Sequence, residues 1–175
     1  SFLRKILSSV GFGAAKVETV VTGSVVHPGQ ELSGMVLMRG GEVEQPIGAM
    51  HLELCTNYAH EHETRRRERI YVLTETGIYQ PFVLGRKQER EFPFSLPIPL
   101  DCPISRQLSK VWLATRLDIS MAIDPKDHDP IEVAPLPDMA MTVEALELLG
   151  MRCTRVGCES VESLNRDRPF CQLFM

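Results

Sequence analysis

The stretch from Val111 to Ile123, VWLATRLDISMAI, alternates strictly between apolar and mixed positions. The odd positions are Val111, Leu113, Thr115, Leu117, Ile119, Met121 and Ile123. A period of two predicts a β-strand with one buried face, because a helix would scatter these aliphatic side chains around its surface. An extended segment of this length would span roughly 43 Å, so we expect a bend or bulge part-way along it. The chain must therefore build a sheet around this strand.

Several other segments alternate in the same way and are separated by turn-forming residues. The further predicted strands are residues 15–21, 31–39, 47–58, 78–84 and 90–96, with a turn at residues 27–30, and the block of strands ends near Val133. Prolines 93, 97, 99 and 103 cannot donate to a ladder, so we expect this part of the chain to lie at a sheet edge or to run across the sheet as an extended segment. Many short strands with Gly and Pro turns predict an all-β, immunoglobulin-like sandwich over residues 1–134.

Residues 58–76 (YAHEHETRRRERIYVLTET) are rich in charge and predict a long hairpin whose tip stands in water. Arg65, Arg66 and Arg67 are candidate contacts for phosphate or an acidic partner, although the neighbouring glutamates nearly neutralise them, which favours a plain charged surface. His60 and His62 share a strand face that can present a metal, but no third ligand stands at a fixed distance.

A short amphipathic helix is predicted at the N-terminus. Its apolar residues at helical spacing are Phe2, Leu3, Ile6, Leu7 and Val10, and Gly11 and Gly13 follow. A helix this short is not stable alone in water, so it must dock on something. It packs on its own domain, in the groove of a protein partner, or on a membrane surface.

Residues 135–175 have a different pattern. Asp138 is a predicted N-cap, an apolar stripe follows at Met139, Val143, Leu146 and Leu149, and Gly150 can close the helix. Strands are predicted at residues 151–158 and 168–174. The segment is much shorter than the ~100 residues of a second immunoglobulin-like sandwich. We therefore expect a connector, one helix and the first strands of an incomplete second lobe.

The composition excludes some functions. A net charge of −4 and a pI near 5.7 argue against a surface for nucleic acid. No run of 18 apolar residues is present, and the N-terminus lacks the apolar core of a secretory signal. The five cysteines form no CxxC pair, so we expect buried structural thiols in a reducing cytoplasm.

No catalytic motif can be assembled from the sequence, and no cofactor is expected. The one dense carboxylate group is Asp124, Asp127 and Asp129. Three aspartates would supply only part of a calcium site, because calcium takes six to eight oxygen ligands. Aspartates beside prolines also form turns, and we favour a turn here.

Five segments carry a resemblance to a known family. They are SFLRKILSSVGFGAAKVETV, HPGQELSGMV, PFSLPIPLDCPIS, VWLATRLDISMAIDPKDHDPIEV and ALELLGMRCTRVGCE. In these the chain resembles the bacterial sporulation-control protein M family, which is arrestin-like. The resemblance implies two β-sandwich lobes and a non-enzymatic regulatory role through protein contacts. The chain departs from the family pattern in two respects. Family members carry a full second lobe, whereas this sequence ends with PFCQLFM. In addition, no motif assigns Arg116 and Asp118 to the buried charge network that joins the lobes of arrestins.

The favoured interpretation is a cytoplasmic arrestin-like adaptor that binds proteins through sheet edges, the 60–69 hairpin and the N-terminal helix. One alternative is a metal-binding module or metal-dependent enzyme using the three aspartates or the two histidines. Another is a membrane-associated scaffold held by Phe2, Leu3, Ile6 and Leu7. Unpaired edges of the two tail strands further predict pairing with a second copy of the chain, which light scattering would test.

Overall fold

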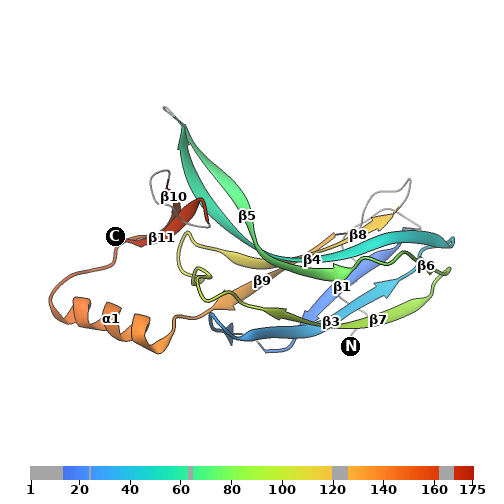
Figure 1. Cartoon of the computed structure of the whole chain (residues 1–175), viewed down its shortest axis with the longest axis horizontal. Helices are drawn as coiled ribbons and strands as arrows, with labels where there is room; N and C mark the ends of the chain where they lie inside the picture. The colour runs from blue at the N-terminus through green and yellow to red at the C-terminus, as the bar shows by residue number, and fades with distance from the viewer. Residues whose placement is uncertain (1–13, 24, 63–64, 120–125, 162–167) are drawn as a thin grey trace.

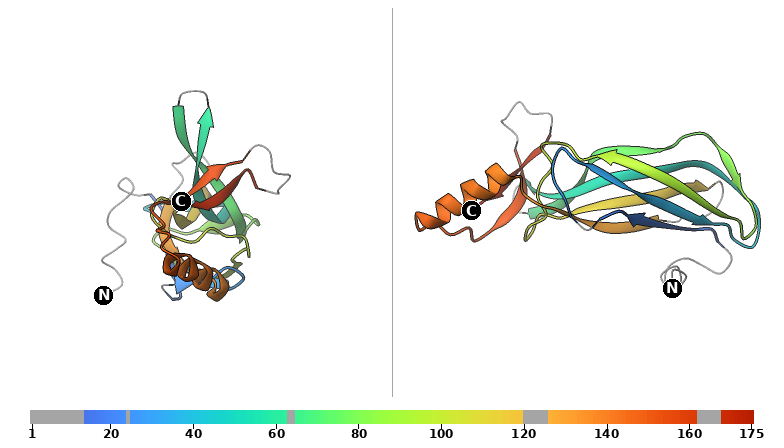
Figure 2. Two further views of the ribbon diagram at one scale, coloured as in Figure 1. Left: turned by 90° about the vertical axis from the view of Figure 1, so that its left-hand side faces the viewer. Right: turned by 90° about the horizontal axis from the view of Figure 1, so that it is seen from below.

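The computed structural model describes residues 14–23, 25–62, 65–119, 126–161 and 168–175. Two β-sheets lie face to face, and a single helix extends beyond one end of the sandwich (Figure 1; Figure 2). The predicted all-β sandwich is confirmed. The predicted N-terminal helix falls outside the described residues.

Eleven strands and one helix are described within these ranges. They are β1 (Lys16–Val21), β2 (Val25–Val26), β3 (Glu31–Arg39), β4 (Gln45–His62), β5 (Arg65–Ile78), β6 (Phe82–Leu84), β7 (Glu89–Pro97), β8 (Val111–Ile119), β9 (Lys126–Val133), α1 (Pro137–Leu148), β10 (Val156–Ser160) and β11 (Phe170–Phe174). The smaller sheet has the order β1-β3-β7, and the larger has β11-β10-β4-β8-β9-β2, with β5 and β6 also paired to β4. The proline-containing strand β7 lies at a sheet edge, as predicted.

Strand β8 is the centre of the core, as its alternation predicts. Every odd position from Val111 to Ile119 is buried and every even position is half-buried. Leu113 and Leu117 are completely inaccessible to solvent. Thr115 is also buried, and its hydroxyl lies 2.7 Å from the hydroxyl of Thr19 on the facing sheet. The polar member of the row is therefore satisfied inside the sandwich.

Two details of the strand predictions need correction. Residues 78–84 are not one strand: β5 ends at Ile78 and β6 begins at Phe82, and both pair with the same strand, β4. Over residues 111–119, the described part of the stretch in which we expected a bend, the extra residue lies on β4 instead, where the register shifts between Ile47 and Ala49. Residues 120–123 lie outside the described residues, so the predicted length of this strand stays a prediction.

The predicted turn across residues 124–130 is wrong from Lys126 onward. Strand β9 begins there and pairs with β8 from Arg116↔Lys126 to Val111↔Ile131. Pro130 is tolerated because β2, the other neighbour of β9, pairs only with Glu132 and Val133. The ladder with β8 outweighs the local turn preference of aspartate and proline.

Helix α1 begins one residue before the predicted N-cap. Its N-cap is Leu136, which makes no side-chain cap, and Pro137 occupies the first turn, where its missing N–H costs nothing. Gly150 follows the C-terminus with φ +86°, as predicted for a closing glycine. No residue of α1 is buried, and Met139 and Val143 of the predicted stripe are half-buried.

The last two strands form a hairpin that joins the larger sheet. β10 pairs with β11 on one side and runs parallel to β4 on the other, with Glu159 opposite Ala59. β10 thus has neighbours on both edges, and the expectation of open edges in the tail is confined to β11. The predicted domain boundary at residue 134 stays a prediction.

Aromatic packing and one glutamine hold this tail hairpin to the body. The ring of Phe170 stacks on Tyr58 at 5.2 Å between centroids and meets Tyr71 edge-on at 5.4 Å. The side-chain amide of Gln172 donates to the Ile104 carbonyl at 2.8 Å and accepts from the Ile104 N–H at 3.0 Å. These contacts make the tail part of the sandwich's own packing.

Candidate interaction surface

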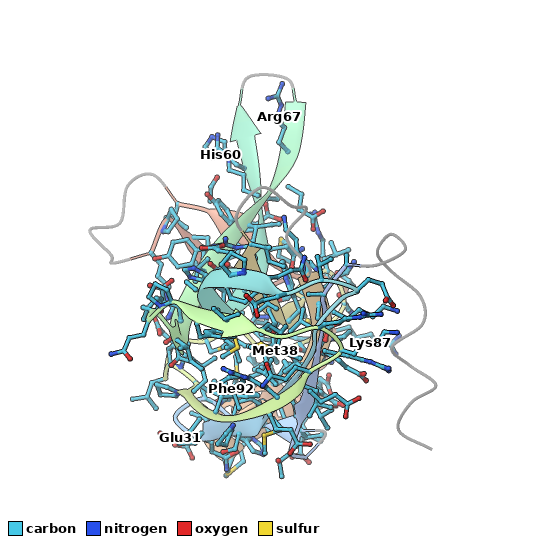
Figure 3. The ribbon with its side chains drawn as sticks, turned by 90° about the vertical axis from the view of Figure 1, so that its right-hand side faces the viewer. Glu31, Met38, His60, Arg67, Lys87 and Phe92 are labelled. Atoms are coloured by element: carbon cyan, nitrogen blue, oxygen red, sulfur yellow. The ribbon has the colours of Figure 1, made fainter. Side chains whose placement is uncertain are left out.

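The hairpin of β4 and β5 stands off the body, as the sequence predicts. Its two strands pair from Met50↔Ile78 out to His62↔Arg65, with one extra residue, Leu73, where the register shifts. β8 leaves β4 at Thr56, and beyond that point β10 pairs with β4 only where Glu159 lies opposite Ala59, below the outer end of the hairpin (Figure 1). His60 and Arg67 face each other across the hairpin, near its outer end (Figure 3).

β5 is an edge strand over its whole described length. It pairs with β4 alone, and its other edge has no neighbour in the order of either described sheet. Ile70 and Val72 remain 67% and 40% exposed, which is unusual for β-branched residues on a strand. Arg67 and Arg69 are exposed beside them. The edge therefore combines open backbone, exposed aliphatic side chains and positive charge.

The two faces of β5 differ in chemistry. Arg67, Arg69 and Tyr71 alternate onto one face, and Tyr71 packs beside the tail hairpin. Glu68, Ile70 and Val72 alternate onto the other. That second face continues the outer surface of the larger sheet.

An apolar row crosses this outer surface in register. Val72, Cys55, Trp112 and Pro130 stand directly opposite one another across β5, β4, β8 and β9. Beside Trp112 lies an open groove of about 540 Å³. Its lining includes Arg106, Lys110, Trp112, Pro130 and Glu132. The sequence pattern assigned the even positions of β8 only to a mixed face and did not find this row.

Arg116 and Asp118 lie on the same outer surface, at the other end of β8. The Asp118 carboxylate accepts from Arg116 and lies 3.1 Å from Nε2 of His51. The ring of Tyr79 meets the His51 imidazole edge-on at 5.5 Å. These two charged residues therefore pair with each other and with His51 on a sheet face.

The predicted aspartate cluster is not gathered as a metal site in the described residues. Asp127 Oδ2 accepts from the backbone N–H of Thr19 at 2.7 Å and so connects the edges of the two sheets. Asp129 lies two residues further along β9, and Asp124 lies outside the described residues. No group of three or more His, Cys, Asp or Glu side chains suited to a metal occurs among the residues described.

The remaining predicted contact residues are only partly described. Arg65 and Arg66 lie in β5 and His62 in β4, but their side chains fall outside the description, while Arg67 is exposed. Phe2, Leu3, Ile6 and Leu7 lie outside it entirely, so contact of this segment with a partner or membrane stays a prediction. No helix in the described part of the chain is long and apolar enough to cross a membrane.

Burial makes two cysteines poor nucleophiles. Loss of solvation raises the pKa of the Cys102 thiol to about 12 and that of Cys55 to about 11. The folded state therefore holds these protons more tightly than the unfolded chain, where thiols ionise near 9.0. Below about pH 9 both thiols are protonated in the folded and the unfolded chain, so they add no pH dependence to the stability. Above about pH 9 the thiols of the unfolded chain ionise first, which stabilises the unfolded state and lowers the free energy of unfolding.

We expect urea unfolding, followed by Trp112 fluorescence, to show lower stability at pH 10.5 than at pH 8. Other groups titrate in this range, so the informative quantity is the difference from a Cys55→Ala, Cys102→Ala variant. That variant should lose less stability between the two pH values. An equal loss in both proteins would contradict the shielding of these thiols.

The sequence matches one family of known proteins over nearly its whole length. The sequence model of the Spo0M family, described as SpoOM protein, matches residues 3–175. The chain belongs to the Spo0M family. The resemblance seen in the sequence motifs is thereby confirmed.

One relative and one solved structure define the relationship further. The sporulation-control protein Spo0M of Bacillus subtilis strain 168 is 37% identical over 177 residues, covering 99% of this chain and 67% of that protein. The crystal structure of Spo0M from Bacillus subtilis superimposes with a TM-score of 0.88 at 34% identity. That match covers 92% of this chain and 66% of the solved chain, so this chain spans about two thirds of the length of its relative.

Proposed function

We propose that this chain is a regulatory adaptor of the sporulation-control type, which acts in the cytoplasm through protein contacts and carries out no reaction. The relationship to the Bacillus subtilis protein, whose name states sporulation control, supports the regulatory role. The single observation that carries the adaptor mechanism is the projecting β4–β5 hairpin, whose outer strand is an open edge with exposed Ile70 and Val72. An unpaired edge with exposed aliphatic residues is a common docking surface for other chains.

The proposal is tested by spore formation. This chain is expressed in a Bacillus subtilis strain whose own Spo0M gene has been deleted, and heat-resistant spores are counted. We expect the chain to change the spore yield relative to an empty vector. Replacing Arg65, Arg66 and Arg67 by glutamate should remove that effect, because the hairpin then repels the partner that it normally binds.

Arg86 offers a control for charge reversal at a single site away from the hairpin. It is exposed, lies in the turn between β6 and β7, and forms a surface pair with Glu42 at 3.3 Å. Arg86→Glu should leave the effect on spore yield intact. The same yield with the chain and with the empty vector would contradict the regulatory role, and full activity of the triple variant would contradict the hairpin as its contact surface.

A further inference from the structure

We propose that the open edge of β5, from Arg67 to Val72, binds an extended acidic segment of a partner protein as an additional strand. This inference rests on the proposed adaptor function and specifies the chemistry of the partner. Main-chain hydrogen bonds to the edge would supply affinity, and alternate side chains would supply specificity. Three observations support it: among the described residues β5 has a neighbouring strand on one edge only, its two faces differ in chemistry, and its outer part is rich in arginine.

The backbone is available for such pairing. β5 has 14 residues and pairs only with β4, so every second N–H and C=O of the described strand points away from its one neighbour. Outside the ladder with β4, residues 67–72 make no backbone hydrogen bond to the other described residues. An added strand would satisfy these groups without a change in the existing sheet.

The side chains of β5 define what the added strand should contain. Arg67 and Arg69 are two residues apart on one face, so carboxylates two residues apart on the partner would lie beside both. Ile70 and Val72 are on the opposite face, where the partner should place β-branched apolar residues. The matching segment alternates acidic and apolar residues.

Charge argues against a second copy of this chain as the occupant. The sequence of residues 65–69 is RRRER, four arginines with one glutamate. Two such edges paired antiparallel about Glu68 would place Arg67 opposite Arg69 and glutamate opposite glutamate. Like charges directly opposite each other destabilise a strand pair, so the edge rejects itself and selects an acidic partner.

The test uses a fluorescein-labelled peptide of sequence EVEVEVE, titrated with the protein and followed by fluorescence anisotropy. We expect saturable binding that weakens as salt is added. The double variant Arg67→Glu, Arg69→Glu should bind about tenfold or more weakly, since two attractions become repulsions. Arg86→Glu with Arg152→Glu makes the same change in net charge at exposed positions away from the hairpin and should bind as the unmodified protein does.

A second peptide separates strand addition from simple attraction between charges. The same sequence with an N-methyl group on every backbone nitrogen keeps its charge but has no backbone N–H to donate to the edge, and we expect its binding to be lost. Equal binding of the methylated peptide, or equal binding to both double variants, would overturn the proposal. Because the peptides vary while the protein stays intact, misfolding of a variant cannot imitate the result.

This outcome is distinguishable from failure of the proposed function. If hairpin variants alter spore yield but the peptide does not bind, the adaptor role stands and strand addition is wrong. If the peptide binds as expected while spore yield never responds to the chain, the edge is a binding site without the proposed regulatory role.

Discussion

Replacing Leu113 by alanine is expected to lower the free energy of unfolding by about 2–5 kcal/mol. Leu113 is completely buried at the centre of β8, opposite Leu54 on the neighbouring strand. Truncation removes apolar contact and leaves a cavity between two sheets that are each held by their own ladders and cannot close easily around it. Urea unfolding followed by fluorescence of the single tryptophan, Trp112, measures the change.

Leu148 provides the matched control for this variant. It is 83% exposed on α1, so the same chemical truncation there should change the stability by less than about 0.5 kcal/mol. If Leu113→Ala were as harmless as Leu148→Ala, the aliphatic row of β8 would not be the core of the fold.

Replacing Phe170 by alanine should cost about 3–5 kcal/mol, although this residue lies only five positions before Met175. Phe170 is 4% exposed and packs against rings from both strands of the projecting hairpin, Tyr58 and Tyr71. Its loss should separate the tail hairpin from β4 and weaken the base of the β4–β5 hairpin. Trp112 lies on β8, outside the tail, so a shift of its unfolding transition reports on the whole sandwich.

Leu173→Ala on the same strand serves as the comparison, because Leu173 is 37% exposed. It should shift the transition only slightly. An unchanged Trp112 transition in Phe170→Ala would show that residues 156–174 fold apart from the sandwich.

The strand pattern of the sandwich follows from the sequence because one face of each strand must be buried. The alternation of residues 111–119 located β8, and the charged stretch after Tyr58 located the hairpin, since neither pattern suits any other element. Gly150 marked the end of α1 for a local reason, its positive φ. In each case the decisive physics acts between residues close in sequence.

The contacts that the sequence did not reveal join residues far apart. The stacking of Phe170 on Tyr58 spans more than a hundred positions, and nothing local to either residue identifies its partner. Asp127 was expected in a turn, but pairing with β8 extended β9 through it and directed its carboxylate to Thr19. The sequence analysis did not identify Ile70 and Val72 as exposed aliphatic residues, because the stretch around them is dominated by charge. Their alternation with Arg69 and Tyr71 within RERIYVL did indicate that they share one face of a strand.

The open edge of β5 can be tested residue by residue by amide hydrogen exchange. In β4, amides from Met50 to Thr56 should all be protected, because this stretch is paired on both sides. In β5, protection should alternate: amides directed at β4 exchange slowly, and those directed outward exchange quickly. Uniformly slow exchange along residues 67–72 would show that the edge is already covered and would contradict the account.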